Sequence, residues 1–298
     1  MKKNIITLEF INQLEAMVLN MNQPMKGFFG GIHKTNEYGS TVEFADFREY
    51  VLGDDIRRID WNLYSRFEKH FIKLYNDEKQ MHIQVFLDCS SSISAIESKS
   101  VAALKTAATL GYLAIHNLDK LSINLIEKNT SRSINGIMSG KEAFFQAIPE
   151  LENIEFSGEA DIENAIINCP NTGYNDGLTI IISDFLTDND WKRAVDYLLY
   201  RHREVMLVHI LSIEELNPAY NGRMYLMDAE AVDKLDEKNL KMKISKSEFE
   251  VYQLALNDYL QDIKDFCIGR QINYIFVKSE DEVEKVLFEQ LYERGAVK

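Results

Sequence analysis

Three oxygen-bearing side chains stand two residues apart directly after a largely apolar run. The run is Ile83–Leu87, and the three residues are Asp88, Ser90 and Ser92. In an extended turn that leaves a strand, this spacing projects all three side chains to the same side. A carboxylate and two hydroxyls are hard oxygen ligands, which suit octahedral Mg²⁺ or Mn²⁺. The spacing therefore predicts a divalent-metal site; the alternative is that these residues cap the following helix.

A second carboxylate follows another apolar run about a hundred residues later. The run is Leu-Thr-Ile-Ile-Ile at 178–182, and Ser183 and Asp184 come directly after it. In an open parallel sheet, ligands bind beyond the carboxyl ends of the strands. Both polar clusters should therefore open onto one edge of the sheet, where Asp184 would supply a further carboxylate to the metal.

Apolar strands alternate with helical patterns from residue 81 onward. Strands are expected at 83–87, 121–126, 178–182, 205–211 and 274–277, and helices at 98–116, 140–151, 162–167, 191–200, 252–266 and 283–291. Strands that alternate with helices imply right-handed βαβ units and a parallel sheet. Uninterrupted apolar strands are typical of a sheet covered on both faces. The predicted fold class is α/β, with a doubly wound, mostly parallel sheet.

Two regions depart from this alternation. Residues 5–22 have helical apolar spacing, and residues 25–80 read as short strands and glycine-rich turns. Residues 213–247 are polar apart from two short segments, which indicates a hairpin excursion. We therefore predict two parts, an N-terminal helix and extension over 1–80 and an α/β domain over 81–298.

The composition restricts the partners and the compartment. The chain has 298 residues and a net charge of −14, which argues against nucleic acid and anionic membrane surfaces as partners. No apolar run is long enough to span a bilayer, so no membrane insertion is expected. Three widely spaced cysteines are typical of a reducing compartment and read as small buried apolar residues. A cytoplasmic protein is expected.

The two polar clusters together resemble a known site. A strand followed by Asp88-x-Ser90-x-Ser92, and a later strand that ends at Asp184, are similar to the metal-ion-dependent adhesion site of von Willebrand factor A domains. The resemblance implies a sheet of that type, a bound Mg²⁺ or Mn²⁺ ion, and a protein partner that contributes an acidic residue.

The adhesion-site pattern also includes a threonine from a middle loop. The matching stretch here is Ser157–Ile162, and Ala160 occupies the threonine position. Asp161, Glu159 or water could substitute for the missing ligand. The resemblance therefore implies weak metal binding.

The segment upstream of the sheet is similar to the signature of the bacterial domain of unknown function 58 family. The residues that carry it are Gly39, Glu43, Phe44, Arg48, Tyr50, Gly53, Asp54, Asp55, Arg57, Ile59, Asp60, Trp61 and Arg66. Mixed charges this close together usually satisfy one another, so we favour an internal ion-pair network that clamps this segment onto the α/β domain. The alternative is a contact surface for a partner or a phosphate, for which Arg48 and Arg66 are the best candidates.

The family resemblance implies a function through its partners. Members are paired with MoxR-type AAA+ ATPases, which implies a partner or adaptor in chaperone-like assembly. This chain has no Gly-Lys-Ser/Thr phosphate loop, so it is not itself the ATPase. The leading prediction is a non-enzymatic, metal-dependent protein-binding module.

Two other functions stay open. One is a phosphoryl-transfer or hydrolytic enzyme that uses Asp88 as nucleophile, although Ser90 stands where that chemistry needs a second carboxylate. The other is a scaffold with a degenerate metal site, which Ala160 favours.

Overall fold

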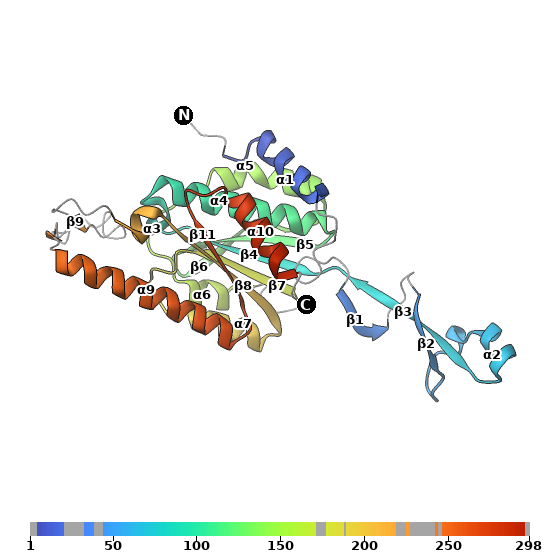
Figure 1. Ribbon diagram of the computed structural model, residues 1–298. Helices are drawn as coiled ribbons and strands as arrows, with labels where there is room; N and C mark the ends of the chain where they lie inside the picture. The colour runs from blue at the N-terminus through green and yellow to red at the C-terminus, as the bar shows by residue number, and fades with distance from the viewer. Residues whose placement is uncertain are drawn as a thin grey trace. The chain divides into compact units, whose positions relative to one another are not determined.

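The protein forms two compact units in a computed structural model (Figure 1), one spanning Gly30–Met81 and the other Met1–Phe29 together with His82–Lys298. The structure describes residues 5–20, 33–38, 44–170, 177–187, 189–218, 225–226, 242–243 and 246–295. Helix α1 (Leu8–Asn20) belongs to the larger unit. The division drawn from the sequence grouped this helix with the residues up to 80, and those boundaries stay a prediction.

A six-stranded sheet is the centre of the larger unit. Its strands are β4 (His82–Asp88), β5 (Lys120–Glu127), β6 (Thr130–Met138), β7 (Gly177–Ser183), β8 (Arg203–Leu211) and β11 (Asn273–Lys278). They lie in the order β11-β8-β7-β4-β5-β6, and all neighbours pair in parallel except β6, which is antiparallel to β5. The predicted α/β class with a doubly wound, mostly parallel sheet is confirmed. The edge strand β6 was not predicted.

Helices cover both faces of this sheet. They are α3 (Ser91–Ser94), α4 (Glu97–His116), α5 (Lys141–Glu152), α6 (Ile162–Ile167), α7 (Trp191–Tyr200), α8 (Ile213–Leu216), α9 (Lys246–Gly269) and α10 (Val283–Gly295). Helices α1, α4, α5 and α10 lie on one face, and α6, α7 and α9 on the other (Figure 1). Because both faces are covered, β4 and β7 are buried along their whole length, as their apolar sequences indicate.

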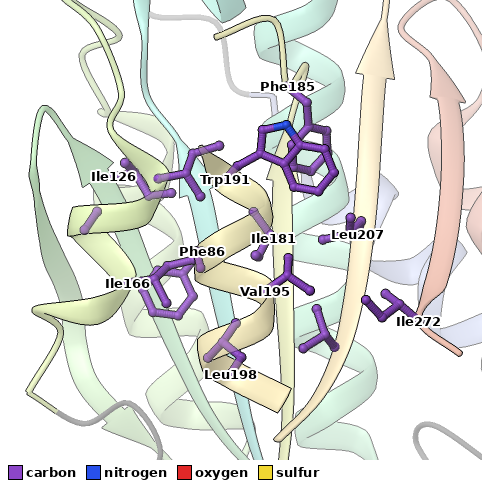
Figure 2. Close-up of a cluster of buried hydrophobic side chains, with 14 of the residues drawn as sticks. Phe86, Ile126, Ile166, Ile181, Phe185, Trp191, Val195, Leu198, Leu207 and Ile272 are labelled. Carbon is purple, nitrogen blue, oxygen red and sulfur yellow. The ribbon is translucent and has the colours of Figure 1, made fainter. Parts of the chain in front are cut away.

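A hydrophobic cluster fixes the central strands beneath α6 and α7 (Figure 2). Phe86 and Ile181 come from β4 and β7, and the rings of Phe185 and Trp191 lie with their centroids 4.9 Å apart. Each large buried apolar side chain contributes on the order of 1.5–3 kcal/mol. Phe185 directly follows Asp184, so its burial anchors the loop that carries this carboxylate.

Two further expectations concern the burial of the cysteines and the absence of membrane-spanning helices. Cys89, Cys169 and Cys267 are all buried thiols, which confirms their interpretation as small buried apolar residues. Within the described ranges, no helix is long and apolar enough to cross a membrane.

The smaller unit contains a three-stranded antiparallel sheet in the order β1-β3-β2. Its elements are β1 (His33–Tyr38), β2 (Phe44–Glu49), the 3₁₀ turn η1 (Ile56–Arg58), α2 (Trp61–Phe67) and β3 (Phe71–Lys79). Short strands were expected here, whereas α2 was not.

In the polar segment 213–247, β9 (Tyr225–Leu226) and β10 (Met242–Lys243) pair antiparallel. The sequence predicts a hairpin excursion at this place. Residues 219–224, 227–241 and 244–245 lie outside the described residues.

Candidate functional site

Asp88 and Asp184 stand at the ends of neighbouring strands. Asp88 is the last residue of β4, Asp184 directly follows β7, and these strands pair in parallel. Both side chains are buried, at 3 % and 1 % exposure. The predicted placement of the two carboxylates at one edge of the sheet is therefore confirmed.

Both carboxylate oxygens of Asp88 accept hydrogen bonds. The backbone N–H of Ser90 donates to Oδ1 at 2.8 Å, and the hydroxyl of Ser183 donates to Oδ2 at 2.6 Å. Burial and, after it, the charge of Asp184 raise the pKa of Asp88, against the lowering effect of these hydrogen bonds. The charge of Asp184 thus disfavours the charged form of Asp88.

The serines of the first loop contact each other. The hydroxyl oxygens of Ser90 and Ser92 are 2.9 Å apart. Ser90 occupies the N-cap position of α3, but its side chain makes no capping hydrogen bond to that helix. The capping alternative therefore does not hold for Ser90, and the two hydroxyls contact each other.

The middle loop lies against the first loop through two backbone hydrogen bonds. Ser91 N donates to Gly158 O at 2.8 Å, and Ser157 N donates to Cys89 O at 2.9 Å. Ala160 follows in this loop and is buried. The loop that carries the threonine position is thus adjacent to the first loop, and Ala160 has no side-chain oxygen.

Asp161 is engaged in a helix cap. Its Oδ1 accepts a hydrogen bond from Asn164 N at 3.0 Å, and its Oδ2 accepts one from Asn164 Nδ2 at 2.7 Å. Both contacts hold the Asp161 carboxylate at the start of α6. A ligand role for Asp161 stays a prediction that this geometry does not favour.

Lys99, on α4, completes the site and was missed in the sequence. Its side chain is fully buried, and Nζ donates to Asp184 Oδ2 at 2.7 Å, to Glu215 Oε1 at 2.7 Å and to Ser92 O at 3.1 Å. Although burial lowers the pKa of Lys99, the charges of Asp184 and Glu215 outweigh that effect and raise it above its ordinary value. The group is therefore a charged ammonium.

One sequence signal could have identified Lys99. On α4 it shares a helical face with Ala103, Thr106 and Leu110, which are all buried. A lysine on such a face is at a core position. A lysine is almost never fully buried unless its charge is paired, so Lys99 should have charged partners.

Glu215 was also missed, although it stands in a capping box. Ser212 Oγ accepts a hydrogen bond from Glu215 N at 3.1 Å, and Glu215 Oε2 accepts one from Ser212 N at 2.9 Å. The box fixes Oε2, and Oε1 is directed to Lys99. We call Asp88, Ser90, Ser92, Lys99, Ser183, Asp184 and Glu215 the strand-end cluster.

The strand-end cluster does not fit a divalent metal ion in this arrangement. Each carboxylate oxygen of Asp88 and Asp184 accepts one hydrogen bond and keeps a lone pair for a further contact, so these bonds alone do not decide the fit. Lys99 supplies a positive charge 2.7 Å from Asp184, and Ala160 supplies no oxygen ligand. In the part of the chain that the structure describes, no three His, Cys, Asp or Glu side chains are grouped to hold a metal.

The signature residues of the smaller unit make local contacts. Asp54 accepts a hydrogen bond from Val51 N at 2.8 Å and forms a 2.9 Å ion pair with Arg48, and these two contacts hold the pKa of Asp54 below its ordinary value. Asp55 caps the 3₁₀ turn by accepting a hydrogen bond from Arg57 N at 3.0 Å. Each acidic side chain thus stabilises the turn in which it stands.

Asp60 has two structural roles in the same unit. Its Oδ1 caps α2 by accepting hydrogen bonds from Asn62 N and Leu63 N, and its Oδ2 pairs with Lys73 Nζ at 3.0 Å. The hydrogen bond from Lys73, together with the two N–H donors, lowers the pKa of Asp60. These contacts all lie within the smaller unit, so a clamp onto the α/β domain stays a prediction.

Other signature residues are exposed. Trp61 is 61 % exposed, and its ring lies edge-on to those of Tyr64 and His70. Arg57 and Arg66 are exposed as well. These side chains are the part of the signature that a partner could contact.

Comparison with solved structures finds distant similarities. The conserved hypothetical protein BatB from Bacteroides thetaiotaomicron is 14% identical, with 73% of this chain and 100% of that chain covered and a TM-score of 0.45. A von Willebrand factor type A protein from Catenulispora acidiphila is 13% identical, with 48% and 35% covered and a TM-score of 0.35.

Comparison of sequences identifies relatives and a protein family. Uncharacterized protein Rv1480 of Mycobacterium tuberculosis is 24% identical over 224 residues, which cover 73% of this chain and 70% of that protein. Uncharacterized protein Mb1516 of Mycobacterium bovis gives the same values. The family described as Protein of unknown function DUF58 matches residues 46–251, which is more than two thirds of the chain. The resemblance drawn from the signature is therefore confirmed, and the chain belongs to the DUF58 family.

Proposed function

We propose that the chain is a non-catalytic protein-interaction module that binds a partner at the strand-end cluster, through an acidic residue of that partner. The observation that carries the proposal is the contact of Lys99 with Glu215, which is a partly exposed carboxylate bound by a buried ammonium. It supports the proposal because a carboxylate is what the adhesion-site resemblance requires of a partner. Glu215 marks the position that a partner's acidic residue would take, and the partner would displace Glu215 from Lys99, because all three donors of the ammonium are in use.

The surroundings of the cluster also support a contact surface. Leu186 and Ile213 lie close in sequence to Asp184 and Glu215, and both are large apolar residues at 39 % and 49 % exposure. A polar centre with exposed apolar neighbours has the composition of a protein interface. The carboxyl edge of a doubly wound sheet is moreover where such folds bind their ligands.

As partner we propose a MoxR-type AAA+ ATPase, because the family resemblance pairs DUF58 proteins with such enzymes. The chain would act as partner or adaptor and leave nucleotide hydrolysis to the ATPase. A tagged chain should retain the ATPase through affinity purification and gel filtration. Elution of the two proteins in separate peaks at micromolar concentrations would reject this partner.

The binding surface is tested by charge-introducing variants. Leu186→Glu and Ile213→Glu should each weaken binding of the ATPase by about tenfold or more, because a charge is buried unpaired in the interface. Ile268→Glu is the matched control, since Ile268 is 73 % exposed and lies near the end of α9, just before the amino end of β11. If the wild type and the three variants all bind the ATPase with equal affinity, the interface does not lie at the strand-end cluster.

The metal requirement is tested in the same binding assay. The metal-dependent form of the proposal requires that EDTA abolish binding and that Mg²⁺ or Mn²⁺ restore it. The positive charge of Lys99 beside Asp184 instead favours binding that EDTA leaves unchanged.

An enzyme that uses Asp88 as nucleophile has less support. Both oxygens of Asp88 accept hydrogen bonds, and the three donors of Lys99 are directed at protein oxygens rather than at an open phosphate position. Wild type and Asp88→Asn should release nitrophenol from nitrophenyl phosphate at the same background rate. Turnover by the wild type that Asp88→Asn abolishes would establish the enzyme instead.

A further inference from the structure

We propose that the ammonium group of Lys99 takes the place of a divalent cation in the strand-end cluster, so that the cluster takes up neither Mg²⁺ nor Mn²⁺. This goes beyond the proposed function, because it concerns the resident cation and holds whether or not a partner binds there.

The ammonium joins two of the chain segments that would hold a metal ion, the first loop and the end of β7, to a third segment, α8. Its three acceptors are Ser92 O in the first loop, Asp184 Oδ2 after β7 and Glu215 Oε1 on α8. A lysine ammonium has three N–H donors and no acceptor, so these contacts use its full capacity. Lys99 thus gathers oxygen ligands from three segments, as a metal ion does, and has no donor left over.

The charges lead to the same conclusion. Asp88 and Asp184 are buried at one sheet edge, and buried carboxylates are retained only when they are paired or hydrogen-bonded. Lys99 neutralises Asp184, while Ser183 and Ser90 stabilise Asp88 by hydrogen bonds. A divalent ion on the same carboxylates would lie close to a fixed positive charge that buried surroundings do not screen.

An independent feature of the sequence agrees with this exchange. The position that supplies a hydroxyl ligand in the adhesion-site pattern is Ala160, and its loop lies against the first loop. Compared with the adhesion-site pattern, this site therefore lacks one oxygen ligand and contains a lysine ammonium. Both differences act against a divalent ion and in favour of the ammonium.

The first test measures metal binding to the wild-type chain. Mn²⁺ is titrated into wild type and Asp88→Asn while electron paramagnetic resonance reports the free ion. A chain of net charge −14 binds some Mn²⁺ on exposed carboxylates, and Asp88→Asn measures that background. We expect the two titrations to coincide. One additional Mn²⁺ per wild-type chain that Asp88→Asn loses would overturn the proposal.

The second test removes the ammonium. In EDTA, Lys99→Met should lower the melting temperature by about 5–10 °C, because Asp184 and Glu215 lose their cation in a buried place. About 10 mM Mg²⁺ or Mn²⁺ should restore part of this loss and should leave the wild type unchanged. Lys264→Met is the matched control, since Lys264 is exposed on α9, and it should melt like the wild type with and without metal.

A double variant keeps the test decisive if Lys99→Met does not fold. Lys99→Met combined with Asp184→Asn removes one charge of each sign, so it should melt above Lys99→Met and should not respond to metal. A Lys99→Met protein that is as stable as wild type in EDTA would overturn the proposal. So would a folded Lys99→Met protein that metal does not stabilise, because the ammonium would then not stand in for a metal ion.

Discussion

The hydroxyl of Ser183 donates a 2.6 Å hydrogen bond to Asp88 Oδ2 and so joins the ends of two neighbouring parallel strands. The same hydroxyl oxygen accepts a hydrogen bond from Phe185 N at 2.9 Å. One side chain thus holds a buried carboxylate and also positions the loop that carries Asp184. Asp184, the next residue in the chain, accepts a hydrogen bond from Lys99 Nζ.

The contacts of Ser183 predict the effect of removing its hydroxyl. Ser183→Ala leaves a buried carboxylate oxygen and a backbone N–H without their partner, so the free energy of unfolding should fall by about 1–3 kcal/mol. Urea denaturation followed by circular dichroism measures this change. Ser94→Ala is the control, because Ser94 is exposed on α3, and it should stay within about 0.5 kcal/mol of wild type. Equal values for both variants would contradict the role of the Ser183 hydroxyl.

Asp60 predicts an effect on one helix of the smaller unit. Asp60→Ala removes the acceptor of Asn62 N and Leu63 N, so the amide hydrogens of the first turn of α2 should exchange faster. Asp60→Asn keeps a capping oxygen but loses the ion pair with Lys73, and should protect these amides better than Asp60→Ala does. Hydrogen exchange with mass spectrometry measures the difference. The same exchange rates in all three proteins would show that the cap does not hold α2.

His82 predicts a pH dependence of stability. Burial, and then the charges of Arg203 and Lys120, lower the pKa of His82 to about 4. An unfolded histidine has a pKa of about 6.5, so between about pH 6.5 and 4 unfolding takes up a proton and stability falls as the pH falls. The contribution of His82 is complete above about pH 6.5.

His82→Gln tests this directly. The variant should lose less stability than wild type between about pH 6.5 and 5, by up to about 1.4 kcal/mol per pH unit. Denaturant midpoints across the pH range give the slope. His202→Asn, which changes an exposed histidine, should keep the slope of the wild type. A parallel pH profile for His82→Gln would show that His82 is not held neutral.

The sequence predicts the strands and the carboxylate pair because both depend on local patterns. Strands β4 and β7 are apolar throughout, and parallel strands bring Asp88 and Asp184 to one edge. The edge strand β6 escaped prediction because most of its side chains are at least partly exposed, so its apolar pattern is weak. The role of Lys99 also escaped, since its partners lie 85 and 116 residues away along the chain. Only the fold brings these three charges together.

The packing of Gly177 predicts a steric effect at the amino ends of β4 and β7, opposite the strand-end cluster. A Cβ atom at this position would lie 2.3 Å from His82 O and 2.9 Å from Arg203 Nη1. A backbone carbonyl inside the sheet cannot move away, so Gly177→Ala should lower the free energy of unfolding by about 1–3 kcal/mol. Gly269→Ala has open space around its Cβ at the end of α9 and should be neutral or slightly stabilising. Urea denaturation of both variants compares them, and a neutral Gly177→Ala would contradict the close packing.

The variant Ala160→Thr tests whether an added hydroxyl creates a Mn²⁺ site in the presence and in the absence of Lys99. With Lys99 present, the added hydroxyl should create no Mn²⁺ site, because the positive charge beside Asp184 remains. Combined with Lys99→Met, Ala160→Thr should bind Mn²⁺ about tenfold more tightly than Lys99→Met alone, since a ligand oxygen is restored. Ala160→Val has nearly the shape of threonine without its oxygen, and in combination with Lys99→Met it should give no such gain. Tight Mn²⁺ binding by Ala160→Thr with Lys99 intact would show that the threonine position alone decides whether the cluster holds a metal.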